Sequence, residues 1–374
     1  MINKPKPDFF LFKSSYLFQM FKKNKKEIFL AFTTIVTASF LGLILLEGYY
    51  WKSGYAKVVC EICRFHPQLG WETIPETTVT NGKVTYTTNA LGMRSPEVDF
   101  SRGHILLVGD SVTFGLGVNN DETVSHFLQN EEKVSSFNFQ VLNFGVPGYG
   151  IGQYYLNLKR HINKLNPKVI VLILYTANDL DETRKDNRYG ISKPFFFYEN
   201  DQLLDLNPKI SQFSCSNIYA RLRFAQHLIP QFIVDRCAER VIERESAQPT
   251  IAKLIHKIKM LGEERNILTL IVLSPALIAV ESVACKTFRA PESCLHFDPG
   301  FEEFYKYFHI IMEVNKLPYV DFLKRLVDYS KEGTVKSLYK ENGKDIHHFS
   351  PQGNLILAKT IAERIVPGKI VAKP

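Results

Sequence analysis

The chain has 374 residues, of which 45% are hydrophobic and only 22% are charged. That composition is too apolar for a disordered protein, and 18 Pro and 21 Gly are too few for a low-complexity or collagen-like chain. The formal net charge of +8 fits a nucleic-acid partner, a membrane surface or neither, so its position along the chain decides its meaning.

The excess positive charge is concentrated at the N-terminus. Residues 1–27 carry seven lysines against Asp8 and Glu27, a net charge of +5. The remaining chain carries only +3 and no recognised basic motif, so we expect no nucleic-acid binding. We interpret residues 1–27 as a cytoplasmic basic tail.

An uncharged apolar stretch follows at 28–46, about the length that a helix needs to cross a bilayer. Lysines before it and aromatic residues after it follow the positive-inside rule, with the N-terminus cytoplasmic and the bulk of the chain periplasmic or extracellular. A cleaved signal peptide and a buried core helix are the alternatives. Because the stretch runs into Glu47 without a small-residue cleavage site and is apolar all round, we expect an uncleaved transmembrane anchor.

All six cysteines follow this span: Cys60, Cys63, Cys215, Cys237, Cys285 and Cys294. An even number on the exported side favours disulfides, and Cys285 with Cys294 could close a short loop. Cys60 and Cys63 form a CxxC with no second CxxC or paired histidines to complete a zinc site. We expect a structural disulfide or inert thiols there, and no redox centre.

Two regions of different pattern follow the anchor. Residues 47–100 read as a small leading subdomain, with a hairpin at 77–88 around Asn81-Gly82. In residues 101–374, short apolar runs alternate with amphipathic stretches, of which 251–261 is the clearest helix and 354–365 is helix-like. The predicted buried strands are 104–109, 139–144, 169–175, 267–274 and 319–322.

This alternation predicts a three-layer α/β domain around a five-stranded, mainly parallel sheet. The gaps at 180–250 and 276–300 are too long for simple crossovers, so we expect insertions there that help to shape a ligand site. The aromatic run 195–198 could line an apolar pocket, although local core is the commoner role of such a run.

The residues that point to chemistry stand at predicted strand ends. Ser111 follows the first strand in Gly109-Asp110-Ser111, and open α/β sheets place reactive groups at the carboxyl ends of their strands. A serine hydroxyl is a weak nucleophile and needs a base with an orienting carboxylate. Asp345 and His348 follow the fifth strand and supply both.

Four blocks in this order resemble the SGNH, or GDSL, hydrolase superfamily. The blocks are Gly-Asp-Ser at 109–111, Asn143 to Gly148, Asn178-Asp179, and Asp345 to His348. The third block departs from the family pattern, because Thr176 stands where a glycine is common. Taken singly, these residues could be helix caps, turn residues or a solvated loop, but together they would require four coincidences.

The resemblance implies a flavodoxin-like SGNH fold and a set of catalytic roles without cofactor or metal. Ser111 would be the nucleophile, His348 the general base and Asp345 the residue that orients it. The backbone N–H groups of Ser111 and Gly148 and the side chain of Asn178 would form the oxyanion hole.

Three neighbouring residues receive lesser roles. His347 competes with His348 for the base, but only His348 stands three residues after Asp345, so we expect His347 to be exposed or to contact substrate. Asp110 and Asp179 are expected to hold their loops by hydrogen bonds. The other histidines show no spacing typical of metal ligands.

The sequence therefore predicts a membrane-anchored serine esterase or acylhydrolase that acts outside the cytoplasm on an acyl ester of an envelope glycan or a lipid. An O-acyltransferase that delivers the acyl group to an envelope polysaccharide uses the same acyl-enzyme and remains an alternative. A non-catalytic glycan-binding protein on the same fold is the third.

Overall fold

The computed structural model describes residues 25–52, 60–165, 167–188, 191–206, 241–288, 299–331, 335–366 and 369–370. They belong to two compact units. One contains helix α2 (Lys25–Lys52), and the other contains the described residues from Cys60 onwards.

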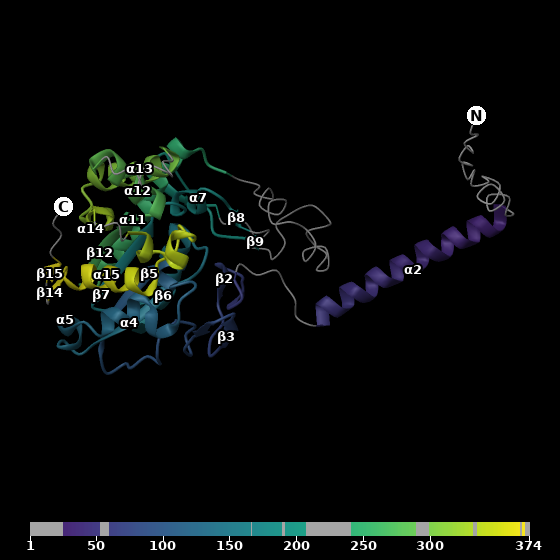
Figure 1. The fold of residues 1–374 in the computed structure, drawn as a ribbon, viewed down its shortest axis with the longest axis horizontal. Helices are drawn as coiled ribbons and strands as arrows, with labels where there is room; N and C mark the ends of the chain where they lie inside the picture. The colour runs from purple at the N-terminus through teal and green to yellow at the C-terminus, as the bar shows by residue number, and fades with distance from the viewer. Residues whose placement is uncertain are drawn as a thin grey trace, which may run out of the picture. The chain divides into compact units, whose positions relative to one another are not determined.

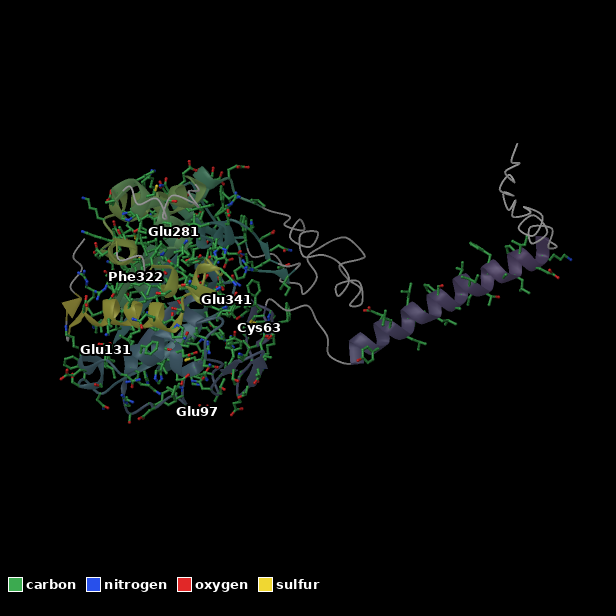
Figure 2. The ribbon with its side chains drawn as sticks, in the orientation of Figure 1. Cys63, Glu97, Glu131, Glu281, Phe322 and Glu341 are labelled. Carbon is green, nitrogen blue, oxygen red and sulfur yellow. A yellow bond between two sulfur atoms is a disulfide. The ribbon has the colours of Figure 1, made fainter. Side chains whose placement is uncertain are left out.

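Helix α2 is long and apolar enough to cross a membrane. Its segment Lys26–Tyr49 has 24 residues and a mean hydropathy of 2.3, and none of its most apolar window is buried. Side chains stand out all around the helix in Figure 2. At about 1.5 Å per residue the segment exceeds the ~30 Å hydrocarbon core of a bilayer. An anchor and a signal sequence both have this property.

The second unit is built around a five-stranded parallel sheet with strand order β13-β12-β7-β5-β6. Its strands are β5 (Gly103–Gly109), β6 (Phe139–Gly145), β7 (Val169–Tyr175), β12 (Leu268–Ser274) and β13 (Tyr319–Asp321). They match the five predicted strands to within one residue at each end. Every residue of β7, the central strand, is buried, as expected for a strand covered on both faces.

Numbered along the chain, this order is 2-1-3-4-5, the flavodoxin-like arrangement. The chain reverses its direction across the sheet after β6, so β5 and β7 flank the switch point. Ligands of open α/β sheets bind outside the carboxyl ends of the strands at that point. The ends of β5 and β7 are therefore where a site is expected, and Ser111 and Asn178 follow them.

Helices cover both faces of the sheet (Figure 1). Right-handed crossovers place α6 (Ile151–Leu165), α11 (Arg244–Glu263) and α13 (Pro299–Val314) on one face, where α11 contacts both of the others. The opposite face carries α4 (Val124–Gln129), α14 (Phe322–Lys331) and α15 (Pro351–Ala362), and α15 contacts α4.

Both predicted helices are present, and each begins several residues before its predicted first residue. The helix expected at 251–261 belongs to α11, which continues N-terminally past Pro249. The helix expected at 354–365 is α15, which begins at Pro351 because Ser350 caps it. The chain then turns into the short pair β14 (Ile365–Val366) and β15 (Lys369–Ile370).

The segment before the sheet forms two hairpins. They are β1 (Cys63–His66) with β2 (Gly70–Thr73), and β3 (Thr78–Asn81) with β4 (Val84–Thr87). Leu69, Trp71 and Met93 of this segment belong to the same hydrophobic core as the sheet. Tyr86 of β4 packs with Ile62 and Phe114 in a smaller cluster.

The remaining elements are short or lie in the predicted insertions. Within 180–250 the structure describes β8 (Asn187–Arg188), β9 (Ile191–Ser192), β10 (Phe196–Glu199) and β11 (Gln202–Asp205); residues 207–240 lie outside it. Phe195 and Phe196 are buried in the main core. The second predicted insertion begins with a helix, α12 (Leu277–Phe288), which contacts α13 and α14. Short helical turns elsewhere are α3 (Ser111–Phe114), η1 (Asn120–Glu122), α5 (Glu132–Ser135), α7 (Asp179–Thr183), η4 (Val335–Leu338) and η5 (Lys340–Gly343).

Among the described cysteines, Cys60 and Cys63 form a disulfide, which is one of the two outcomes expected of the CxxC. Cys285 is also disulfide-bonded. Cys215, Cys237 and Cys294 lie outside the described residues, and so does the predicted pairing of Cys285 with Cys294.

Candidate active site

Ser111 begins the short helix α3 directly after β5. The side chain of Asp110 caps this helix by accepting from the backbone N–H of Val112 at 2.9 Å. The tight passage from strand to helix depends on Gly109, because a Cβ there would lie 2.0 Å from Oγ1 of Thr113. Ser111 is 9% exposed and lines a cavity of about 390 Å³, the Ser111 cavity.

His348 and Asp345 come together with Ser111 in the geometry of a nucleophile, a base and an orienting carboxylate. Nε2 of His348 lies 3.0 Å from Oγ of Ser111. Nδ1 of the same ring lies 2.9 Å from Oδ2 of Asp345. A carboxylate only accepts hydrogen bonds, so Nδ1 carries the proton and Nε2 presents its lone pair to the serine hydroxyl.

The carboxylate of Asp345 is held by further donors. Its Oδ1 accepts from the backbone N–H groups of His347 at 3.0 Å and His348 at 3.1 Å. Burial alone would raise the pKa of Asp345, but the hydrogen bond and charge of His348 outweigh it and hold the pKa well below its usual range. Asp345 is therefore ionised at neutral pH.

Lys340 is a partner of Asp345 that the sequence motifs did not mark. Its Nζ lies 3.2 Å from Oδ2 of Asp345, and its backbone N–H donates to the carbonyl of His348 at 2.9 Å. Glu341 and Asn342, which follow it, have positive φ values of 51° and 55°. This left-handed turn brings Lys340 back over Asp345, and no residue spacing in the sequence encodes it.

The three predicted oxyanion donors line the same cavity. Gly148 adopts a φ of 76°, which favours glycine, in the loop after β6. Within the described residues, neither its backbone N–H nor that of Ser111 donates a hydrogen bond to the protein. The Nδ2 group of Asn178 donates one hydrogen to Oδ2 of Asp110 at 3.0 Å, which leaves its second hydrogen available to a ligand.

Two buried carboxyl groups hold these loops, as the sequence suggested. Asp110 links Ser111's helix to Asn178 through the two hydrogen bonds given above. Asp179 accepts from the hydroxyl of Tyr154 at 2.6 Å and from the backbone N–H of Tyr175 at 2.8 Å. Burial raises the pKa of both carboxyl groups, and the charge of Asp110 raises that of Asp179 further.

His347 is exposed, as expected, and it also lines the Ser111 cavity, so its contact with substrate stays a prediction. Its Nδ1 lies 2.8 Å from the hydroxyl of Tyr175. Tyr175 is a residue of this cavity that the sequence analysis missed. It is the last residue of β7, and a hydroxyl group at the carboxyl end of a predicted strand was the signal that could have identified it. The rim of the cavity carries charges of both signs, on Asp181, Glu182, Lys185 and Arg188.

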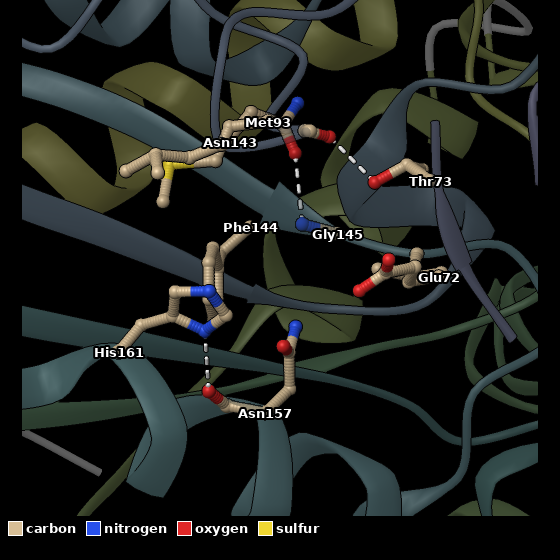
Figure 3. A pocket seen from close by; sticks show the side chains of 11 residues that line it. Glu72, Thr73, Met93, Asn143, Phe144, Gly145, Asn157 and His161 are labelled. Carbon is tan, nitrogen blue, oxygen red and sulfur yellow. Dashed lines mark hydrogen bonds between the residues drawn. The ribbon is translucent and has the colours of Figure 1, made fainter. Parts of the chain in front are cut away.

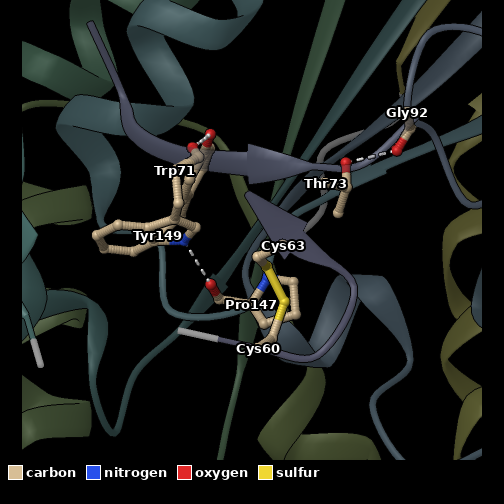
Figure 4. The surroundings of a disulfide bond; sticks show 7 residues. All are labelled: Cys60, Cys63, Trp71, Thr73, Gly92, Pro147 and Tyr149. Atoms are coloured by element: carbon tan, nitrogen blue, oxygen red, sulfur yellow. Dashed lines mark hydrogen bonds between the residues drawn. A yellow bond between two sulfur atoms is a disulfide. The ribbon is translucent and has the colours of Figure 1, made fainter. Parts of the chain in front are cut away.

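The leading segment reaches the cavity through its disulfide hairpin (Figure 4). Cys60 and Pro147 both line the cavity. The indole N–H of Trp71 in β2 donates to the carbonyl of Pro147 at 2.9 Å, directly before Gly148. Trp71 is fully buried, and its own carbonyl accepts from the hydroxyl of Tyr149 at 2.6 Å. The first hairpin therefore packs against the loop that presents Gly148.

A second cavity between β2, β6 and α6 does not suit a substrate (Figure 3). It measures only about 20 Å³, room for one water molecule, and is lined by Glu72, Asn143 and His161 among others. Burial lowers the pKa of His161, so this ring is neutral at neutral pH. Among the described residues, no group of three or more His, Cys, Asp or Glu side chains could hold a metal ion.

Comparison with known proteins gave matches only among solved structures. No family model and no curated protein matches the chain. The lipase/acylhydrolase from Enterococcus faecalis is 15% identical and covers 73% of this chain and 99% of its own, with a TM-score of 0.40. The psychrotrophic esterase EstA from Pseudoalteromonas sp. is 11% identical, over 70% of this chain and 95% of its own, with a TM-score of 0.36.

A third similar structure is described as a lipolytic protein of the G-D-S-L family from Desulfitobacterium hafniense. It is 12% identical, over 70% of this chain and 99% of its own, with a TM-score of 0.37. At TM-scores below 0.5 this likeness carries no conclusion about the present chain. Its own strand order gives a flavodoxin-like α/β fold, and its chemistry has to be derived from the arrangement around Ser111.

Proposed function

We propose that this protein is a serine ester hydrolase that cleaves acyl esters through an acyl-enzyme on Ser111. The observation that carries the proposal is the pair of contacts made by His348, 3.0 Å to Ser111 and 2.9 Å to Asp345. A nucleophile, a base and an orienting group within hydrogen-bond reach are the geometric requirement for nucleophilic catalysis.

In the first half of the reaction, Oγ of Ser111 forms a bond to the ester carbonyl carbon while its proton passes to Nε2 of His348. Asp345, ionised and hydrogen-bonded to Nδ1, stabilises the imidazolium. The negative charge on the former carbonyl oxygen is met by the N–H groups of Gly148, Ser111 and Asn178. His348 then returns the proton to the alcohol oxygen as the C–O bond breaks, and the acyl group remains on Ser111.

In the second half, water gives its proton to His348 and its oxygen forms a bond to the acyl carbon. The bond between Oγ of Ser111 and the acyl carbon then breaks, Oγ takes the proton back from Nε2 of His348, and the acid leaves. The cavity around Ser111 holds about 390 Å³, and charged residues line it beside the apolar Leu116 and Pro147. Such a cavity has room for the water of hydrolysis, and acyl transfer to a hydroxyl acceptor through the same acyl-enzyme is the alternative.

We further propose that α2 anchors the enzyme in a membrane, with the catalytic unit on the far side from the cytoplasm. Lysines precede the apolar segment, and the Cys60–Cys63 disulfide is of a kind that persists in oxidising compartments.

The test of the hydrolase proposal compares full-length wild type with Ser111→Ala, both purified in detergent. Wild type is expected to hydrolyse p-nitrophenyl acetate and to react with a fluorophosphonate probe, and Ser111→Ala is expected to lose at least a thousandfold in kcat and all labelling. Ser125→Ala, another buried serine that lies outside the Ser111 cavity, is the control. Equal hydrolysis by wild type and Ser111→Ala would exclude the proposal.

A further inference from the structure

Another hollow, larger than the Ser111 cavity and distinct from the small cavity beside His161, lies next to the Ser111 cavity. It has a volume of about 680 Å³, within the roughly 300–1,000 Å³ typical of ligand pockets. Its walls are Asn81 and Val84 of the β3–β4 hairpin on one side and Lys340 and Glu341 on the other. Leu116 lines both hollows. We call this larger hollow the Lys340 groove.

The chemistry of ester cleavage assigns a direction to the substrate. The alcohol oxygen receives its proton from Nε2 of His348, so the alcohol part of an ester must lie on the histidine side of Ser111. Lys340 stands behind His348, because its backbone N–H donates to the His348 carbonyl and its Nζ contacts Asp345. Ser111 and His348 themselves line only the Ser111 cavity, and the two hollows meet at Leu116. Because Lys340 contacts both His348 and Asp345, the groove would receive an alcohol part that extends past the histidine and beyond the Ser111 cavity.

The walls of the groove are preformed. The hydroxyl of Tyr86 accepts from the backbone N–H of Gly117 at 2.9 Å, which ties the hairpin to the loop after α3. The guanidinium of Arg94 donates to the carbonyl of Gly115 at 2.6 Å and holds the same loop. Gly117 leaves room for the side chain of Lys340, because a Cβ at position 117 would lie 2.0 Å from Nζ of Lys340.

We propose that the Lys340 groove binds the alcohol part of the ester, and that this part is a neutral polyhydroxylated chain, as in an oligosaccharide. The inference rests on the proposed function and adds to it a subsite and a ligand class. The lining intersperses polar side chains, of which Asn81 and Glu341 are the candidates to bind hydroxyl groups, with the apolar Val84 and Leu116. Glu122 and Ser350 also line the groove, but they cap neighbouring helical turns. Sugars present hydroxyl groups and C–H faces, and such a mixture complements both.

The charge of the lining argues against an anionic alcohol. The residues that line the groove include two glutamates, Glu122 and Glu341, and one lysine, whose ammonium is already paired with Asp345. The carboxylate of Glu122 accepts from the backbone N–H of Asn119, and it keeps its negative charge beside the groove. A phosphate headgroup or a polyuronate would therefore meet net negative charge. A long acyl or alkyl chain would leave the polar groups of the lining without partners.

The test uses two substrates that differ in the alcohol part. Full-length wild type and the double variant Asn81→Ala/Glu341→Asn are compared on p-nitrophenyl acetate and on acetylated cello-oligosaccharides. Asparagine tolerates the left-handed conformation of Glu341, and its shorter side chain withdraws from the groove. Glu199→Ala, an exposed carboxylate outside both hollows, is the matched control.

We expect the double variant to lose five- to tenfold in kcat/KM on the oligosaccharide, through KM, and less than twofold on p-nitrophenyl acetate. Equal losses on both substrates, or no loss on either, would overturn the subsite. A wild type that hydrolyses p-nitrophenyl acetate but not the neutral oligosaccharide, or that prefers an acetylated polyuronate or a lysophospholipid, would overturn the ligand class. Absence of Ser111-dependent hydrolysis of p-nitrophenyl acetate would instead remove the proposed function, and the subsite with it.

Discussion

The ammonium group of Lys340 shares Oδ2 of Asp345 with the ring of His348, at distances of 3.2 Å and 2.9 Å. In the proposed mechanism, a positive charge at this position opposes the formation of the imidazolium. The titratable groups around His348 include Asp345, Lys340 and His347 on its own loop and Asp110 after β5. The same cavity is also lined by the charged residues Asp181, Glu182, Lys185 and Arg188. Lys340 is the cation among them that contacts Asp345 directly.

We predict that Lys340→Met raises kcat/KM on p-nitrophenyl acetate about two- to fivefold. Without the ammonium, Asp345 stabilises the imidazolium that forms in the transition state more strongly, and a partly exposed ion pair is worth roughly 0.2–1 kcal/mol. The measurement is kcat/KM at pH 7 for wild type and variant. Lys340→Arg keeps the charge and should keep the wild-type rate, as should Lys344→Met, an exposed residue of the same loop that forms no ion pair with Asp345 within the described residues. A lower rate in Lys340→Met would contradict the electrostatic role and indicate a structural one.

At the scale of single residues, the sequence was sufficient to predict some contacts of the candidate site and not others. Asp345 and His348 stand three residues apart in one loop, so their contact is local and their spacing predicts it. The contact of Lys340 depends on two left-handed residues that are not glycines, Glu341 and Asn342. Residue preferences do not predict such a turn, because the surrounding structure imposes it.

At the scale of elements, the five strands of the sheet were predictable because buried parallel strands are continuous apolar runs. The contact of the leading segment with the Gly148 loop was not predictable. Trp71 lies 76 residues before the carbonyl that its indole contacts, and no periodicity relates two such positions. The hairpin β1–β2 therefore supports the Gly148 loop through contacts that only the folded chain displays.

We predict that Trp71→Phe lowers kcat on p-nitrophenyl acetate about tenfold and leaves KM unchanged. Phenylalanine keeps most of the packing but removes the N–H that holds the Pro147 carbonyl, so the proposed donor at Gly148 loses its fixed position. Oxyanion contacts act in the transition state, so their loss appears in kcat and not in KM. The stability of the variant, followed by thermal unfolding, should fall by about 1–3 kcal/mol because a buried carbonyl loses its partner.

The control for this prediction is a core variant of similar cost away from the loop. Ile162→Val in α6 removes one buried methyl group and is expected to cost about 0.5–1.5 kcal/mol with kcat unchanged. If both variants lost kcat in proportion to their loss of stability, the effect of Trp71→Phe would reflect general loosening. A selective loss in Trp71→Phe would assign the hairpin to the catalytic machinery.

At the scale of the whole molecule, the helical segment Lys26–Tyr49 raises the question of which side of a membrane the proposed reaction takes place on. The unit's described cysteines are all disulfide-bonded, which supports the proposed location of that unit in an oxidising compartment. The lysines before α2 support the proposed orientation by an independent argument, since the positive-inside rule favours lysines on the cytoplasmic side. An anchor and a cleaved signal sequence differ only in whether the helix remains on the mature chain.

We predict an uncleaved anchor with the C-terminus outside the cytoplasm. A C-terminal fusion to an alkaline phosphatase that is active only after export should be active, and a fusion to a reporter that is active only in the cytoplasm should be silent. The N-terminal sequence of the membrane-bound protein should lie before Lys25, the start of α2. Replacing Lys22, Lys23, Lys25 and Lys26 with glutamine should reduce the fraction of chains in this orientation, whereas replacing the same number of lysines beyond residue 324 should not. A mature chain that begins after Gly48 and is released from the membrane would identify α2 as a signal sequence and leave the catalytic unit soluble outside the cytoplasm.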